Sequence, residues 1–127
     1  MDTGKNMTIL VIDDSNTNIV LLQAVLNGKG YKIETALNVK EAYNIMNRNM
    51  PDLILLDLLL PRINGYDFLK EIKSDIRTKG IPVVVVSALT DQENVTKAMA
   101  LGAYDFIKKP VDIQKLVELV ATVIKNQ

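Results

Sequence analysis

Short apolar runs alternate along the chain with longer segments in which apolar residues recur at helical spacing. Three of the runs are continuously apolar, which is typical of parallel strands that are covered on both faces. The sequence therefore predicts five strands separated by helices. The strands are predicted at residues 8–12, 31–35, 53–56, 82–86 and 104–107.

The segments between these runs carry the signals of amphipathic helices. The clearest is the last one, where a stripe of apolar residues three and four positions apart follows Asp112, a residue type that caps helices. The stripe consists of Ile113, Leu116, Val117, Val120 and Ile124. Capping-box spacing precedes two other helices, at residues 90–93 and, more weakly, at residues 38–41. The remaining helices are predicted within residues 16–28 and 64–73.

The alternation of strands and helices predicts an α/β fold. Short connections between successive strands favour a doubly wound, five-stranded parallel sheet with five helices distributed over both faces. Of the two common strand orders of this architecture, 2-1-3-4-5 suits five strands best and is typical of flavodoxin-like folds. Precedent, and not the sequence itself, selects this order.

Length and composition limit the class of protein. The 127 residues fit one domain, which we place at residues 7–125 after a short flexible lead-in at residues 1–6, with no output domain. Fifteen basic residues balance fifteen acidic ones, so the chain offers no electrostatic footprint for direct nucleic-acid binding. The absence of cysteine and histidine excludes disulfides and metal sites built on either residue. No apolar run is long enough to span a membrane and the N-terminus lacks a signal-peptide pattern, so we expect a cytoplasmic protein with no membrane partner.

Polar residues come at the carboxyl ends of four predicted strands. Asp13 and Asp14 follow the first strand, Asp57 the third, Ser87 the fourth and Lys109 the fifth. In a doubly wound sheet these ends lie along one edge, and the first and third strands are neighbours in the assumed order. Three carboxylates repel one another there unless a cation is bound. A hard divalent cation such as Mg²⁺ prefers oxygen ligands, so the sequence predicts an Mg²⁺ site at this edge.

The same edge holds the groups needed to receive a phosphoryl group. A bound metal would attract a phosphoryl donor and offset its charge, so that Asp57 could attack it and form an aspartyl-phosphate. The hydroxyl of Ser87 and the ammonium of Lys109 could hold the phosphoryl oxygens. Taken alone, each residue has a simpler interpretation: Asp13 and Asp14 as helix caps, Asp57 as a turn residue, Lys109 as a surface lysine. Their joint occurrence at converging strand ends favours the site.

Four motifs make the sequence resemble the receiver domains of two-component response regulators over essentially its whole length. They are VIDDS, PDLILLDLLLPRINGYDFL, PVVVVSAL and GAYDFIKKP. The resemblance implies that Asp57 accepts a phosphoryl group from the phosphohistidine of a histidine kinase or of a histidine phosphotransfer protein. It also implies that Asp14, Asp57 and the backbone carbonyl of Leu59 bind Mg²⁺ directly, while Asp13 acts through water.

The resemblance further implies a conformational switch. Ser87 and Lys109 would bind the phosphoryl oxygens, and the Lys109–Pro110 peptide bond would be cis. As Ser87 moves toward the phosphoryl group, Phe106 would rotate inward and change the face formed by the fourth helix, the fifth strand and the fifth helix. A downstream protein target, or a second copy in a homodimer, would dock on that face. Phe106 departs from the tyrosine that is frequent in the family, so its ring carries no hydroxyl to bond a partner.

Three other functions fit parts of the pattern. A flavin-binding electron carrier can share the fold, but its first loop must cradle phosphate with backbone donors, whereas the acidic loop at residues 12–16 would repel it. An Mg²⁺-dependent aspartyl phosphatase of the haloacid dehalogenase-like class needs an acid two residues after the nucleophile, and Leu59 cannot transfer a proton. A non-phosphorylated docking module would not need the complete polar set. We therefore predict a phosphorylation switch that is not a turnover enzyme.

Overall fold

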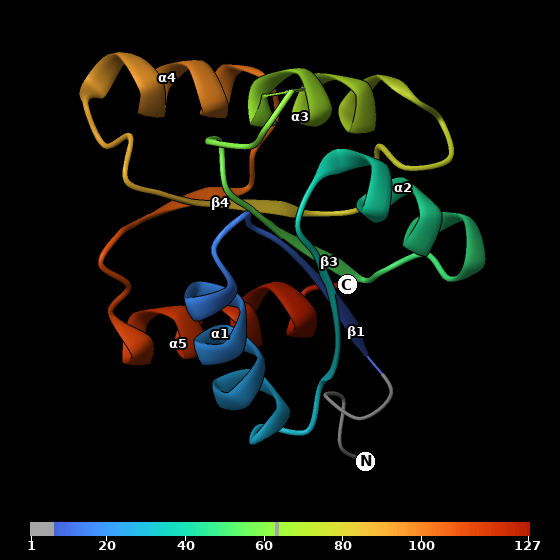
Figure 1. Ribbon diagram of the computed structural model, residues 1–127, viewed down its shortest axis with the longest axis vertical. Helices are drawn as coiled ribbons and strands as arrows, with labels where there is room; N and C mark the ends of the chain where they lie inside the picture. The colour runs from blue at the N-terminus through green and yellow to red at the C-terminus, as the bar shows by residue number, and fades with distance from the viewer. Residues whose placement is uncertain (1–6, 63) are drawn as a thin grey trace.

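Parallel strands form one sheet at the centre of the molecule (Figure 1). The computed structural model describes residues 7–62 and 64–127. Its strands are β1 (Thr8–Ile12), β2 (Lys32–Ala36), β3 (Leu53–Leu56), β4 (Val83–Ser87) and β5 (Asp105–Lys108). They follow the order β2-β1-β3-β4-β5, which confirms the predicted α/β class, the doubly wound arrangement and the strand order. The predicted lead-in at residues 1–6 lies outside the described residues.

Helices connect the strands and cover the sheet on both faces. They are α1 (Asn16–Asn27), α2 (Val39–Arg48), α3 (Gly65–Ser74), α4 (Gln92–Ala100) and α5 (Ile113–Lys125). Figure 1 shows α1 and α5 on one face of the sheet and α2, α3 and α4 on the other. Among the described residues, no helix has the length and apolar character that crossing a membrane requires.

Two apolar cores flank the sheet because successive strand residues point to opposite faces. One core packs residues such as Val11, Leu55 and Val84 against α1 and α5. The other packs the alternate residues of the same strands, such as Ile12 and Leu56, against α2, α3 and α4. Every residue of β1, β3 and β4 is buried, which explains why these three runs are continuously apolar.

Polar side chains cap four helices by accepting a hydrogen bond from the backbone N–H three residues later. These caps are Ser15, Asn38, Asn64 and Asp112. Those of α2 and α5 confirm the predictions made from the sequence. The capping box predicted at residues 90–93 is wrong, because α4 begins one residue later than that box requires. Its cap residue, Asp91, accepts a hydrogen bond from the Asn94 side chain instead.

Three strands lie one residue later than predicted. The strands β2, β4 and β5 begin and end one position beyond the ranges 31–35, 82–86 and 104–107. Hydrophobicity marks only the apolar part of a strand, whereas backbone pairing sets its ends, and in β4 and β5 the pairing extends into the polar residues Ser87 and Lys108. Ser87 is thus the last residue of β4, and it is paired in register with Lys108 of β5.

Gly65 brings the start of α3 against the backbone that follows β3. Its N–H donates a hydrogen bond to the carbonyl oxygen of Leu58 over 3.0 Å. A Cβ atom at this position would lie 2.5 Å from Leu58 Cα and 2.6 Å from the carbonyl oxygen of Asp57. Both neighbours are backbone atoms that cannot rotate away, so only glycine lets α3 begin this close to Asp57.

We expect Gly65→Ala to lower the free energy of unfolding by about 2 kcal/mol, because the added methyl group forces the backbones apart. Gly80→Ala is the matched control, since a Cβ atom at Gly80 would meet no heavy atom within 4 Å. Urea denaturation of the wild type and both variants measures the difference. Equal unfolding free energies for the two variants would contradict the close approach at Gly65.

Candidate functional site

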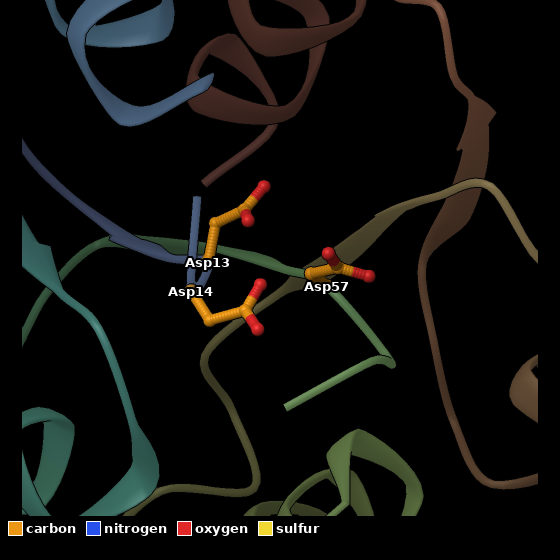
Figure 2. Close-up of side chains that lie close together, drawn as sticks. All are labelled: Asp13, Asp14 and Asp57. Carbon is orange, nitrogen blue, oxygen red and sulfur yellow. The ribbon is translucent and has the colours of Figure 1, made fainter. Parts of the chain in front are cut away.

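Three carboxylates gather where β1 and β3 end (Figure 2). The strand β1 runs directly into Asp13 and Asp14, and β3 runs into Asp57. The last residues of the two strands, Ile12 and Leu56, are in register, and Asp57 N donates to the carbonyl oxygen of Ile12 over 2.9 Å. One carboxylate oxygen from each aspartate lies within 4.8 Å of those of the other two. The structure confirms that these side chains meet.

Two of the three carboxylates are buried, which requires hydrogen-bond donors to stabilise their charge. Asp13 is 2% exposed and Asp57 is 4% exposed, whereas Asp14 is open to solvent. Backbone N–H groups supply one donor to each buried side chain. Ser15 N lies 2.9 Å from Asp13 Oδ1, and Leu59 N lies 3.0 Å from Asp57 Oδ1. The second oxygen of each buried carboxylate accepts a hydrogen bond from a lysine.

That lysine, Lys109, bridges the two buried carboxylates. Its Nζ lies 2.8 Å from Asp13 Oδ2 and 2.9 Å from Asp57 Oδ2. Burial lowers the pKa of the Lys109 ammonium, but the hydrogen bonds and charges of Asp13 and Asp57 outweigh that effect and raise the pKa overall. Lys109 is therefore protonated at neutral pH. One ammonium against three carboxylates still leaves a net negative charge at the site.

The donor atoms of this edge fit a hard divalent cation. Across residues 7–62 and 64–127, Asp13, Asp14 and Asp57 form the one group of three acidic side chains whose ligand atoms lie close enough to share an ion. Mg²⁺ commonly takes one or two carboxylates and keeps several waters. Asp14 is exposed to solvent, whereas both oxygens of Asp13 and both oxygens of Asp57 already accept hydrogen bonds from the protein. The cluster is therefore a candidate metal site.

Ser87 lies fully buried at the end of β4 and is linked to Lys109 through the backbone. Lys109 N donates to the carbonyl oxygen of Ser87 over 3.0 Å. The hydroxyl oxygen of Ser87 accepts a hydrogen bond from Leu89 N over 3.2 Å. The Lys109–Pro110 peptide bond is cis, as the resemblance implied. Ser87 and Lys109 thus lie at the edge where the sequence predicted them.

Phe106 and Leu59 lie close to this edge, but their functional roles stay predictions. Phe106 is a half-buried residue of β5, is paired in register with Val85, and packs against the core shared with α3 and α4. Its inward rotation is a prediction. Leu59 approaches Asp57 through its amide, and its side chain is 51% exposed. Coordination of a metal by its carbonyl oxygen is likewise a prediction.

Asn18 contacts the site although the sequence alone did not indicate it. Asn18 lies on the first turn of α1, and its Nδ2 atom lies 3.4 Å from Asp13 Oδ2. Its backbone N–H donates to the hydroxyl oxygen of the cap, Ser15. The signal in the sequence is an amide side chain five residues after Asp13. In the structure, Ser15 caps the first turn of α1 and places this side chain near the end of β1.

Comparison with known proteins points to a single family. The chain matches the family model of the response regulator receiver domain over residues 9–121. Response regulator PleD of Caulobacter vibrioides is 38% identical over 104 residues, which are 82% of this chain and 23% of PleD. Response regulator SaeR of Staphylococcus aureus is 33% identical over 109 residues, which are 86% of this chain and 46% of SaeR. The chain spans less than half the length of these relatives.

Solved structures are similar over nearly the whole chain. A receiver domain of a signal transduction histidine kinase from Syntrophus aciditrophicus gives a TM-score of 0.87 at 32% identity, covering 94% of this chain and 91% of that one. A chemotaxis response regulator of Vibrio cholerae gives a TM-score of 0.85 at 26% identity, covering 92% and 98%. The comparison of sequences and the comparison of structures therefore point to the same family.

We expect Mg²⁺ to bind the protein weakly and Asp14→Asn to weaken this binding roughly tenfold, because the variant loses one of the two carboxylates that the resemblance implies as direct ligands. Asp67→Asn, which removes an exposed carboxylate on α3, is the control. A titration followed by NMR amide shifts measures each affinity. If Asp14→Asn binds Mg²⁺ as tightly as the control, Asp14 is not a ligand.

Proposed function

The chain belongs to the receiver domain family of two-component response regulators, and we propose that it is a phosphorylation switch with Asp57 as the phosphoacceptor. Receiver domains are signalling switches that interact with histidine kinases and downstream effectors. One observation above all supports the proposal: the buried carboxylate of Asp57 is held by Lys109 at the strand end where Asp13 and Asp14 also lie.

In the proposed reaction, a carboxylate oxygen of Asp57 attacks the phosphorus of a partner's phosphohistidine. The new O–P bond forms as the N–P bond breaks, and the electrons of the broken bond return to the imidazole of the donor. Each Asp57 oxygen accepts one hydrogen bond, from Leu59 N or from Lys109 Nζ. These two donors fix the direction of the carboxylate, so that the nucleophile is oriented before the donor arrives.

Positive charge at this edge would offset the charge of the transferred group. We infer that Asp14, Asp57 and the backbone carbonyl of Leu59 hold Mg²⁺, with Asp13 contacting it through water. An ion held there would supply positive charge to stabilise the phosphoryl oxygens during transfer. Lys109, whose Nζ contacts Asp57 Oδ2, would turn to one of these oxygens.

Ser87 supplies the second proposed contact to the phosphoryl group. Its oxygen accepts a hydrogen bond from Leu89 N, so its own proton can be donated. Movement of Ser87 toward the phosphoryl group would let Phe106 turn inward and change the face formed by α4, β5 and α5. A downstream protein target or a second copy of the chain would dock there. Because Phe106 has no hydroxyl to form a hydrogen bond, the partner would recognise the position of the ring instead.

The same residues argue against a turnover phosphatase. The side chain two residues after Asp57 is Leu59, which cannot transfer a proton to or from water.

We also propose that residues 7–125 act as one receiver unit in the cytoplasm. This unit would bind a histidine kinase or a histidine phosphotransfer protein there, and it would make no direct contact with nucleic acid or membrane.

We expect acetyl phosphate or phosphoramidate, with Mg²⁺, to add one phosphoryl group to the protein. Asp57→Asn should abolish the addition, because the amide lacks the nucleophilic oxygen. Intact-mass measurement before and after treatment detects the product. The control Asp67→Asn, on the surface of α3, should be phosphorylated like the wild type. Undiminished phosphorylation of Asp57→Asn would show that another residue is the acceptor.

We expect a phosphoryl mimic to change the face of α4, β5 and α5 at a distance from Asp57. Beryllofluoride with Mg²⁺ should alter amide hydrogen exchange at residues 88–101 and 104–109, because Ser87 of β4 lies between Asp57 and this face, to which Phe106 of β5 belongs. Residues 28–31, which follow the far end of α1, should keep their exchange rates. Changes confined to the loop after Asp57 would show that no switch reaches the face.

A further inference from the structure

Asn18 has no role in the reaction proposed above, yet its side chain points at the most buried carboxylate of the site. It is half-buried, and its Nδ2 lies 3.4 Å from Asp13 Oδ2. Its backbone N–H donates to Ser15 Oγ over 3.3 Å, which fixes the first turn of α1 beside Asp13. The amide is therefore presented to Asp13 by the cap of the helix.

The hydrogen bonds that the Asp13 carboxylate accepts differ in number and strength between its two oxygens. Its Oδ1 atom accepts one hydrogen bond, from Ser15 N at 2.9 Å. Its Oδ2 atom accepts two, from Lys109 Nζ at 2.8 Å and from Asn18 Nδ2 at 3.4 Å. The short contact to an ammonium is much the stronger of these two, and 3.4 Å exceeds the usual N–H···O distance. While Lys109 is in place, the Asn18 contact adds little to the stability of the Asp13 carboxylate.

Phosphorylation would change this balance, because the same ammonium also holds Asp57 Oδ2 at 2.9 Å. A phosphoryl group on Asp57 moves negative charge outward onto its own oxygens, and Lys109 would follow that charge. Asp13, at 2% exposure, would then lose its strongest donor and keep Ser15 N, Asn18 Nδ2 and the proposed Mg²⁺-bound water as partners. A buried acceptor that loses its partner carries a large desolvation penalty.

We propose that Asn18 is a positioning residue that takes over the hydrogen bond to Asp13 Oδ2 when Lys109 turns to the phosphoryl group. This inference rests on the proposed function. The amide carries two N–H donors and needs to approach by only a few tenths of an ångström to reach normal hydrogen-bond distance. Asn18 thereby keeps the Asp13 carboxylate in place in both states of the site.

The first test is a double-mutant cycle on folding without any phosphoryl group or metal, in buffer with EDTA. Asn18→Leu, which has the same shape and no donor, should lower the folding equilibrium constant less than about threefold in the wild type, because Lys109 still serves Asp13. In Lys109→Met it should lower the constant by about tenfold or more, because Asn18 is then the remaining side-chain donor to Oδ2. Urea denaturation measures all four proteins.

Asn16→Leu is the matched control, because Asn16 is an exposed asparagine on the same turn of α1. It should have the same small effect on folding in the wild type and in Lys109→Met. If Asn18→Leu is also additive with Lys109→Met, Asn18 does not act as a substitute donor and the inference is overturned.

The second test uses beryllofluoride with Mg²⁺ as the phosphoryl mimic, with bound fluoride measured by fluorine NMR. Asn18→Leu should weaken beryllofluoride binding by about fivefold or more, because the bound state draws Lys109 away from Asp13 Oδ2 and the variant cannot replace that hydrogen bond. Asn16→Leu should bind like the wild type. Equal affinities for Asn18→Leu and the wild type would overturn the inference. Failure of the wild type itself to bind would instead overturn the proposed function, and the folding cycle would still decide the role of Asn18.

Discussion

The bridge from Lys109 to Asp13 and Asp57 is the interaction on which the charged edge of the sheet depends. The two carboxylates come from different strands and are almost completely buried, which ionised groups tolerate only with donors in place. One ammonium, at 2.8 and 2.9 Å, satisfies both. Breaking a buried ion pair by removing one partner costs about 3–5 kcal/mol. Lys109 follows β5, so this residue ties the far side of the sheet to the ends of β3 and β1.

The same packing that makes the sheet stable confines its chemistry to this edge. The three central strands are buried on both faces, where an unpaired polar side chain would be costly. Polar residues therefore appear immediately after the strands β1 and β3 end. Asp57 shows how sharp the boundary is, because Leu56 and Leu58 on either side of it are buried, whereas the Leu59 side chain is half exposed. A carboxylate inside an apolar run is tolerated because it lies at the strand end, with Leu59 N and Lys109 as donors.

Hydrophobic patterning was sufficient to predict the strands and the two-sided packing. The convergence of Asp13, Asp14 and Asp57 also required the strand order, which came from precedent. Patterning failed where pairing or local geometry decides the outcome. Ser87 belongs to β4 because its backbone pairs with Lys108, a contact that no apolar pattern reveals. The capping box predicted at residues 90–93 failed because α4 begins one residue later than the box requires, with Asp91 as its cap residue. Asn18 was not predicted, because its contact with Asp13 depends on how α1 leaves the end of β1. The motions assigned to Ser87 and Phe106 stay predictions, because they concern a second state.

The backbone of Asp57 has little freedom to respond when its side chain is modified. Its N–H is bonded to the carbonyl oxygen of Ile12, and its own carbonyl oxygen lies against Gly65, where even a methyl group would not fit. A phosphoryl group would therefore act by exchanging the hydrogen-bond partners of the side chain and not by moving β3. The proposed responders, Lys109 and Ser87, are bonded to each other through Lys109 N and the Ser87 carbonyl oxygen. Because this bond joins the ends of β4 and β5, the proposed shift of either residue would be passed to the neighbouring strand, and from there toward α4 and α5.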